Sequence, residues 1–466
     1  MTNTPDNTQQ LTTLMPRGNL KGLLIMLIAA GLAFGLEAVL PFDANANKGL
    51  AILLFVAILW FTEAVHITVT ALMVPILAAL CAIPKMETKA ALSSFADPII
   101  FIFFGGFALA TALHMQKLDK KIAMWLISLS KGNMLLAVLL IFLVTAFLSM
   151  WISNTATAAM MLPLALGMMD HLDKEKDRHT FAFVLLGIAY SASIGGLGTL
   201  VGSPPNMIAA KALSLDFPGW MKLGVPMMLI ILPLMVFSLY VVLKPNLKQG
   251  SADLHKNQHI PWTPIRIITM ILFVCTALAW IFSSKIAEYY PIAKLDTIIA
   301  LIAAVLVVVL GLATWKDVAD NTDWGVLLLF GGGIALSNLL KLSGASAVLG
   351  EQMASAFVLA HPFLVVLGVT AFIVILTEFT SNTASAALLV PIFASIATQM
   401  GLPKEVLVMV IGIGASCAFM LPVATPPNAI VFGTGLIKQR DMMRVGMLLN
   451  ALCIVIIAAW AYFFLM

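Results

Sequence analysis

The sequence predicts an all-α polytopic membrane protein with about eleven transmembrane helices and two re-entrant hairpins, arranged as an inverted repeat. The 466-residue chain is 61% hydrophobic and 10% charged, and its mean hydropathy is +1.03. A soluble domain of this length does not have such a composition. Apolar segments follow one another along the chain, and two of them contain the same polar break, Ser-Asn-Thr.

The apolar segments differ in length, and the longest ones indicate the hairpins. A hydrocarbon core of about 30 Å needs about 20 helical residues, so the two longest segments are too long for one span and too short for two. The leg from Ala156 to Met169 covers roughly 21 Å, which favours a re-entrant hairpin over one long tilted helix. The segments run over residues 20–40, 49–63, 67–84, 97–116, 133–169, 181–213, 219–243, 266–284, 296–314, 324–342, 361–398, 405–435 and 443–465.

These segments divide the chain into two similar halves. The N-terminal tail lacks a basic region typical of a cleavable signal peptide. Lysine and arginine are in excess in the loops on one side of the predicted spans. This bias predicts a cytoplasmic N-terminus and an external C-terminus in a bacterial inner membrane. The expected parts are a cytoplasmic tail (1–19), a first half (20–243) with hairpin 133–169 and broken helix 181–213, a cytoplasmic connecting loop (244–265), and a second half (266–466) with hairpin 361–398 and broken helix 405–435.

An internal repeat relates the halves. Residues 153–163 read SNTATAAMMLP and residues 381–391 read SNTASAALLVP, identical at seven of eleven positions. Gly105-Gly106 matches Gly332-Gly333 upstream, and a Pro-Pro-Asn follows each Ser-Asn-Thr downstream. Such similarity indicates duplication. Five predicted spans separate the hairpins, an odd number, so the second hairpin is expected to open to the opposite face. An inverted repeat of this kind places a transporter's site at the midplane.

The repeated motifs are suited to binding an anion. Ser203-Pro204 and Thr425-Pro426 each combine an N-cap residue with a proline at the first helical position. The outgoing hairpin legs are expected to begin at Asn154-Thr155 and Asn382-Thr383. Four helix N-termini would then converge, and each offers free N–H groups and partial positive charge. The motifs contain no lysine or arginine, which suits a carrier that must also release its ligand.

The same turns offer oxygen atoms for a cation. Incoming helix ends leave carbonyls unsatisfied, and neutral oxygen cages at such ends are where carriers hold Na⁺. In ordinary helix bundles Ser, Thr and Asn bond across helices, but the duplication of both motifs favours binding. The first expected cage is Ser149, Ser153, Asn154 and the Gly202 carbonyl; the second is Thr377, Ser381, Asn382 and the Ala424 carbonyl.

Glu378 admits two interpretations at this stage. An intramembrane carboxylate is by default a functional candidate. It is equally a possible structural acceptor for backbone N–H groups at the hairpin, because the first half has Met150 at the matching place.

At these residues the chain resembles the divalent anion/sodium symporter family, the INDY-type dicarboxylate carriers. The resemblance rests on both Ser-Asn-Thr motifs, both Pro-Pro-Asn breaks, the paired hairpins and the central loop. It implies a homodimer whose protomers contain a scaffold and a mobile transport domain that moves as an elevator. It also implies sodium at both cages and substrate at Asn154, Thr155, Ser203, Asn382, Thr383, Thr425 and Pro426.

The expected function is sodium-coupled symport of C4-dicarboxylates such as succinate, malate and fumarate. The expected partners are this anion, the lipid bilayer and a second copy, with sodium as coupling ion and no organic cofactor. Alternatives are a sodium-independent exchanger, a carrier of sulfate or citrate, and a cation/proton antiporter that uses Glu378. An enzyme is not expected, since no His-Glu-x-x-His or Gly-x-Ser-x-Gly is present. Nucleic-acid binding is not expected either, because the sequence has no basic stripe interleaved with aromatic residues.

Overall fold

The computed structural model describes residues 20–248, 260–357 and 360–466, and these residues form helices joined by turns and loops. The prediction of an all-α membrane protein is therefore confirmed. The tail 1–19 and residues 249–259 of the connecting loop lie outside the described residues. Within them, eight segments are long and apolar enough to cross a membrane: α2 (Leu20–Val39), α3 (Ala44–Thr62), Thr88–Met115 with α6 (Pro98–Met115), Arg178–Gly198 with α10 (Arg178–Gly195), α12 (Phe217–Leu243), α13 (Pro264–Ile281), α17 (Trp324–Ser343) and α23 (Gln439–Leu465).

Three of the eleven expected spans lack a single helix long enough to cross a membrane: two are shorter than predicted, and the third is the broken helix expected over residues 405–435. Helix α4 (Ile67–Leu80) has 14 residues and α15 (Leu295–Val309) has 15, or roughly 21–23 Å of helix. Each ends just before a residue with positive φ, Ala82 after α4 and Gly311 after α15. The third expected span is interrupted between α21 (Lys404–Gly414) and α22 (Pro426–Phe432). Two further helices, α7 (Leu118–Ser128) and α18 (Ala345–Ala356), follow α6 and α17 in the chain.

The short helices α4 and α15 pack across the two halves. Helix α4 packs against α17 of the second half, and α15 packs against α6 of the first. A Cβ added at Gly105 would lie 2.6 Å from the Cβ of Ala300, and one at Gly332 would lie 2.5 Å from the Cβ of Ala71. Only glycine permits these two crossings, which explains the repeated Gly-Gly pairs as close helix contacts.

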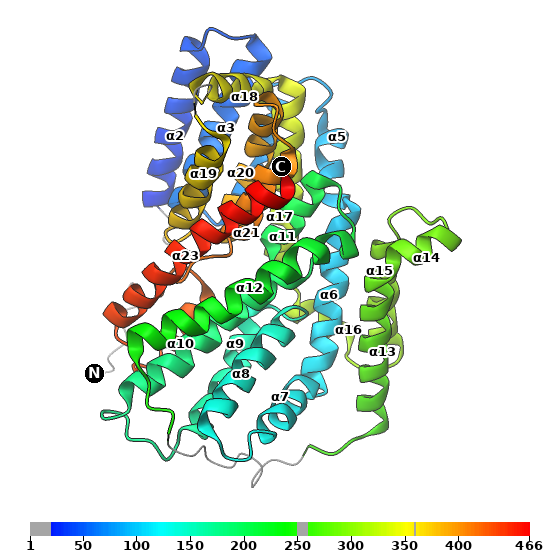
Figure 1. Cartoon of the computed structure of the whole chain (residues 1–466). Coiled ribbons are helices and arrows are strands. Elements are labelled where there is room, and N and C mark those ends of the chain that lie inside the picture. The colour runs from blue at the N-terminus through cyan, green and yellow to red at the C-terminus, as the bar shows by residue number, and fades with distance from the viewer. Residues whose placement is uncertain (1–19, 249–259, 358–359) are drawn as a thin grey trace, which may run out of the picture.

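The two Ser-Asn-Thr segments form helix–turn–helix pairs. The first is α8 (Met134–Ser149) with α9 (Asn154–Met168), and the second is α19 (Pro362–Leu376) with α20 (Asn382–Gln399). Figure 1 shows the first pair in the lower part of the molecule and the second in the upper part. Each outgoing leg contacts the short helix after the break of the other half, α9 with α22 and α20 with α11 (Pro204–Leu213). The broken helices therefore join the two hairpins.

The remaining described helices are short connecting elements. Helix α5 and the 3₁₀ turn η1 precede α6, the 3₁₀ turn η2 follows α10, and α14 and α16 flank α15. Their bounds are Thr88–Ser93 (α5), Ser94–Ala96 (η1), Gly196–Gly198 (η2), Ser283–Tyr289 (α14) and Trp315–Asn321 (α16).

Candidate functional site

At the tip of the first hairpin, side-chain and backbone oxygens converge. The Ser149 hydroxyl donates to the Ala192 carbonyl at 2.7 Å and lies 2.7 Å from the Asn154 amide oxygen. The same end of the Asn154 amide lies 3.1 Å from the Ala192 carbonyl and 3.2 Å from the Gly202 carbonyl. With its nitrogen turned inward, the amide would donate to all three oxygens. With its oxygen inward, the Ser149 hydroxyl supplies one hydrogen to this group of oxygens, and the Gly196 N–H donates to the Ala192 carbonyl.

The second hairpin repeats this arrangement. The Thr377 hydroxyl lies 2.6 Å from the Asn382 amide oxygen and donates to the Ala415 carbonyl at 2.8 Å. The Asn382 amide oxygen thus has the same position beside a hydroxyl as the Asn154 amide oxygen. The structure thus brings together Ser149, Asn154 and Gly202 in the first half, and Thr377 and Asn382 in the second. The carbonyls of Ala192 and Ala415 were not anticipated.

Ser153 and Ser381 have another local role. Ser153 is the N-cap of α9, and its hydroxyl accepts from the Ala156 N–H at 3.3 Å. Ser381 is the N-cap of α20 and accepts from the Ala384 N–H at 3.4 Å. These hydroxyls orient the outgoing legs, so that Asn154 and Asn382 occupy the first helical position of each leg.

The two helices that begin after the breaks, α11 and α22, differ in their N-terminal caps. The Thr425 hydroxyl caps α22 by accepting from the Asn428 N–H at 3.3 Å. Ser203 precedes α11 but makes no such bond, which corrects the expectation of a cap there. Its hydroxyl lies 3.4 Å from the hydroxyl of Ser416 in the other break. The two broken helices therefore meet at this pair.

The asparagine of each Pro-Pro-Asn holds its own break together. The fully buried Asn206 amide donates to the carbonyls of Gly196 and Thr199, both at 2.7 Å. The fully buried Asn428 amide donates to the carbonyls of Ala418 and Leu421, both at 3.0 Å. Each donates to carbonyls ten and seven residues earlier, in the backbone where the helix is interrupted. Sequence analysis identified the motif as a break and missed this role of the asparagine.

The side chains expected to face the substrate lie beside these tips and differ in exposure. Thr155 and Pro426 are exposed, Thr383 is half-buried, and Thr425 is buried. Thr155 and Thr383 lie in the first turns of α9 and α20, and Pro426 begins α22. The N-termini of these helices are therefore open on one side while the oxygen clusters are enclosed.

Comparison with known proteins identifies the chain. The model of the sodium:sulfate symporter transmembrane region matches residues 19–466. The chain belongs to the sodium:sulfate symporter family. It is 56% identical to a protein of Haemophilus influenzae described as an uncharacterised transporter, over 95% of this chain and 97% of that protein. It is 34% identical to the sodium-dependent dicarboxylate transporter SdcS of Staphylococcus saprophyticus, over 95% of this chain and 91% of the relative.

A solved structure shares the fold of this family member. The YdaH transporter of Alcanivorax borkumensis superimposes with a TM-score of 0.54 at 13% identity, covering 96% of this chain and 99% of YdaH. The identity is low, so the likeness concerns the fold alone. Together with the apolar spans, the family model and the SdcS relative make the chain a multi-pass membrane transporter.

Within this sodium:sulfate symporter fold, Glu378 is a hydrogen-bond acceptor. The side chain is 2% exposed and accepts from the backbone N–H groups of Phe419 at 2.7 Å, Met420 at 3.0 Å and Leu421 at 3.1 Å. The Asn450 amide of α23 donates to it at 2.7 Å. Of the two interpretations of Glu378, the geometry matches the structural one, although its partners lie in the second break rather than at the hairpin.

Proposed function

We propose that this transporter carries C4-dicarboxylates such as succinate, malate and fumarate into the cell together with sodium ions. The observation that supports it best is the duplicated oxygen cluster at the hairpin tips. Each cluster combines a hydroxyl, an amide oxygen and a backbone carbonyl without a carboxylate. Hard cations prefer oxygen ligands, and carriers hold Na⁺ at unwound backbone and half-helix ends.

The donor set fits sodium. In the first cluster, the Asn154 amide lies within 3.2 Å of three oxygens, only one of which carries a hydrogen. A cation among these atoms would remove the mutual repulsion of the carbonyl dipoles. Ser153 and Ser381 would contribute backbone or hydroxyl oxygens beside it, and the Ala424 carbonyl would complete the second cluster. Among the described residues, no group of three or more His, Cys, Asp or Glu could hold a metal, so the proposal rests on neutral oxygens.

The helix N-termini fit a dicarboxylate. Asn154 and Thr155 begin α9, and Asn382 and Thr383 begin α20. Free N–H groups and the helix dipole at each end favour one carboxylate, and two ends suit a ligand with two. Ser203, Thr425 and Pro426 would line the space between them. A relative named for sodium-dependent dicarboxylate transport, at 34% identity, supports this substrate class.

The packing is compatible with an elevator. The hairpins and broken helices contact one another through the pairs α8 with α10, α9 with α22, α11 with α20 and α19 with α21. We propose that these helices form the moving domain, and that α3, α4, α6, α13, α15 and α17 form the scaffold of a homodimer. We further propose that the protein resides in the bacterial inner membrane with its N-terminus in the cytoplasm, its C-terminus outside, and re-entrant hairpins that open to opposite faces.

Uptake by the purified protein in liposomes tests this function. Labelled succinate should accumulate under an inward Na⁺ gradient and should not accumulate when choline replaces Na⁺. Equal uptake in choline would disprove sodium coupling, and no uptake of any C4-dicarboxylate would disprove the substrate class.

Sulfate is the second candidate, because the matching family model is described by sodium:sulfate symport. Counterflow separates the candidates. Liposomes loaded with unlabelled succinate, citrate or sulfate should accelerate entry of labelled succinate only when the internal anion is itself a substrate. Counterflow of succinate without any dependence on Na⁺ would favour a dicarboxylate exchanger.

A further inference from the structure

A cavity borders α11 and α20, the helices that begin near the proposed dianion site. It has a volume of about 230 Å³ and is lined by α6 and α17 on one side and by α11 and α20 on the other. Ala387 lines it in the second turn of α20, and Met207 lines it in the first turn of α11. Roughly 15 Å³ of such volume holds one water, so a small dicarboxylate has room. We call this cavity the vestibule.

The vestibule is positively charged. Its lining contains the side chains of Lys211 and Lys341, together with Ser337 and Asn338, and among the described residues no acidic side chain lines it. Lys341 and Asn338 are exposed, which places them at its mouth. Lys341 takes part in none of the ion pairs found among the described residues. A cleft lined by one sign of charge attracts ions of the other sign.

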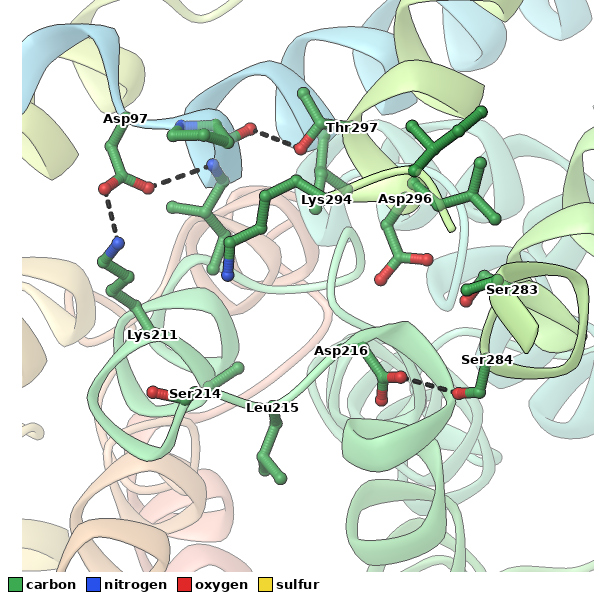
Figure 2. Close-up of a pocket in the computed structure, with 17 residues that line it drawn as sticks. Asp97, Lys211, Ser214, Leu215, Asp216, Ser283, Ser284, Lys294, Asp296 and Thr297 are labelled. Carbon is green, nitrogen blue, oxygen red and sulfur yellow. Dashed lines mark hydrogen bonds and ion pairs between the residues drawn. The ribbon is translucent and has the colours of Figure 1, made fainter. Parts of the chain in front are cut away.

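Lys211 is already paired, and its partner is a carboxylate. Its ammonium group donates to Asp97, the N-cap of α6, and Figure 2 shows the two groups facing each other at the edge of a neighbouring cavity. That cavity, about 290 Å³, also contains Asp216, Lys294 and Asp296. Since Asp97 does not line the vestibule, Lys211 stands between a carboxylate on one side and the vestibule on the other.

We propose that the vestibule is a transient binding site for the dicarboxylate on its way to the hairpin tips. Lys341 attracts the first carboxylate, and Lys211 exchanges its bond with Asp97 for a bond with the ligand. The exchange keeps the ammonium group charged and paired, but it takes the ion pair away from Asp97, which retains the Ile99 N–H as a donor. The vestibule therefore has a low affinity for the dicarboxylate, as a transient site must have if the ligand is to move on. This inference rests on the proposed function.

The kinetics of uptake in intact cells test the proposal. The full chain is expressed in a bacterial host without dicarboxylate carriers, and initial rates are measured against external succinate at saturating Na⁺. Lys341→Gln should raise KM about two- to fivefold with Vmax unchanged, and Lys341→Arg should restore the wild-type KM. The difference between Lys341→Gln and wild type should shrink at high ionic strength, because salt screens exposed charges.

Asp97→Asn should change KM in the opposite direction. Asparagine is a good N-cap, so α6 keeps its start while Lys211 loses its competing carboxylate, and KM should fall. Lys294→Gln is the matched control, because it removes a lysine of the neighbouring cavity and should leave KM unchanged.

Each result has one meaning. A wild-type KM in Lys341→Gln would overturn the vestibule and make Lys341 a membrane-surface anchor. A raised KM in Asp97→Asn would overturn the exchange at Lys211. If the wild type itself shows no sodium-dependent uptake of succinate, the proposed function fails instead.

Discussion

The two hairpin tips have the same hydrogen bonds at the cage and different supports behind it. Ser149 in the first half and Thr377 in the second both place a hydroxyl between an asparagine amide and a backbone carbonyl. The next position differs. Met150 packs its side chain against Gly198, whereas Glu378 accepts from three N–H groups of the second break.

The difference shows which part of the repeat is constrained. In the first half, the break runs through Gly196 and Gly198 and is held by the Met150 contact and by Thr199, whose hydroxyl donates to the Met150 carbonyl. In the second half, the matching N–H groups donate to the Glu378 carboxyl group, which Asn450 of α23 also contacts. The ligand geometry is kept, while the support is apolar in one copy and polar in the other. Four pairs of substitutions sharpen this comparison, from the largest expected effect to the smallest.

Removing either cage amide should have the largest effect. Asn154→Ala and Asn382→Ala each delete an oxygen of one cluster and a donor of one helix N-terminus. Leaving the remaining groups unpaired costs about 1–3 kcal/mol, so sodium affinity should fall about tenfold or more. Sodium titrations of succinate uptake measure the loss, and membrane insertion is checked by gel filtration in detergent. Near-normal uptake in either variant would contradict the equivalence of the two cages.

Glu378→Gln tests the unequal supports. Glutamine keeps one acceptor oxygen but replaces the other with a donor that faces backbone N–H groups, so stability should fall by about 1–3 kcal/mol. The pH profile of uptake should remain that of the wild type, because a structural acceptor does not carry protons. Met150→Leu is the counterpart and should cost less than about 1.5 kcal/mol. Thermal unfolding in detergent compares them. Loss of pH dependence in Glu378→Gln would instead support a titrating carboxylate.

Replacing the asparagine of either break should have the next largest effect, and the loss should be equal in the two breaks. Asn206→Ala and Asn428→Ala each remove two bonds to backbone carbonyls, worth about 1 kcal/mol apiece. Faster amide exchange should appear around each break, measured by hydrogen–deuterium exchange. Asn321→Ala is the control, since its amide also donates to a carbonyl but lies exposed at the end of α16. If only one of the two breaks loosens, the clamps are not equivalent.

The smallest expected effect is the difference in stability loss between substitutions at the N-termini of α22 and α11. Thr425→Ala removes a cap and should cost about 1 kcal/mol, whereas Ser203→Ala removes no cap and should cost less. Thermal unfolding without sodium or substrate isolates this structural term. An equal cost at both positions would mean that the contact of Ser203 with Ser416 is worth as much as a cap.

The sequence predicted local features well and distant contacts poorly. The hairpin legs, the helix starts at Pro204 and Pro426, and the matching of Ser149 with Thr377 follow from short motifs whose physics is local. The partners of Glu378 lie 41 to 72 positions away, and no periodicity encodes such a separation. The sequence showed Asn206 only as part of a duplicated motif and gave no sign that its amide binds the carbonyls of the break. The short spans α4 and α15 were overestimated because hydropathy continues into their terminal turns.

The crossed pairing of α4 with α17 and of α15 with α6 has a consequence for how the protein is made. Neither Gly105 nor Gly332 meets its alanine until a helix from the other half has been synthesised. Between the end of α4 at residue 80 and the start of α17 at residue 324, the ribosome needs on the order of 10–50 s at about 5–20 residues per second. During that time α4 stands in the bilayer without its partner. Folding of the scaffold is thus a late event, and truncation after the first half should leave a substrate for membrane quality control.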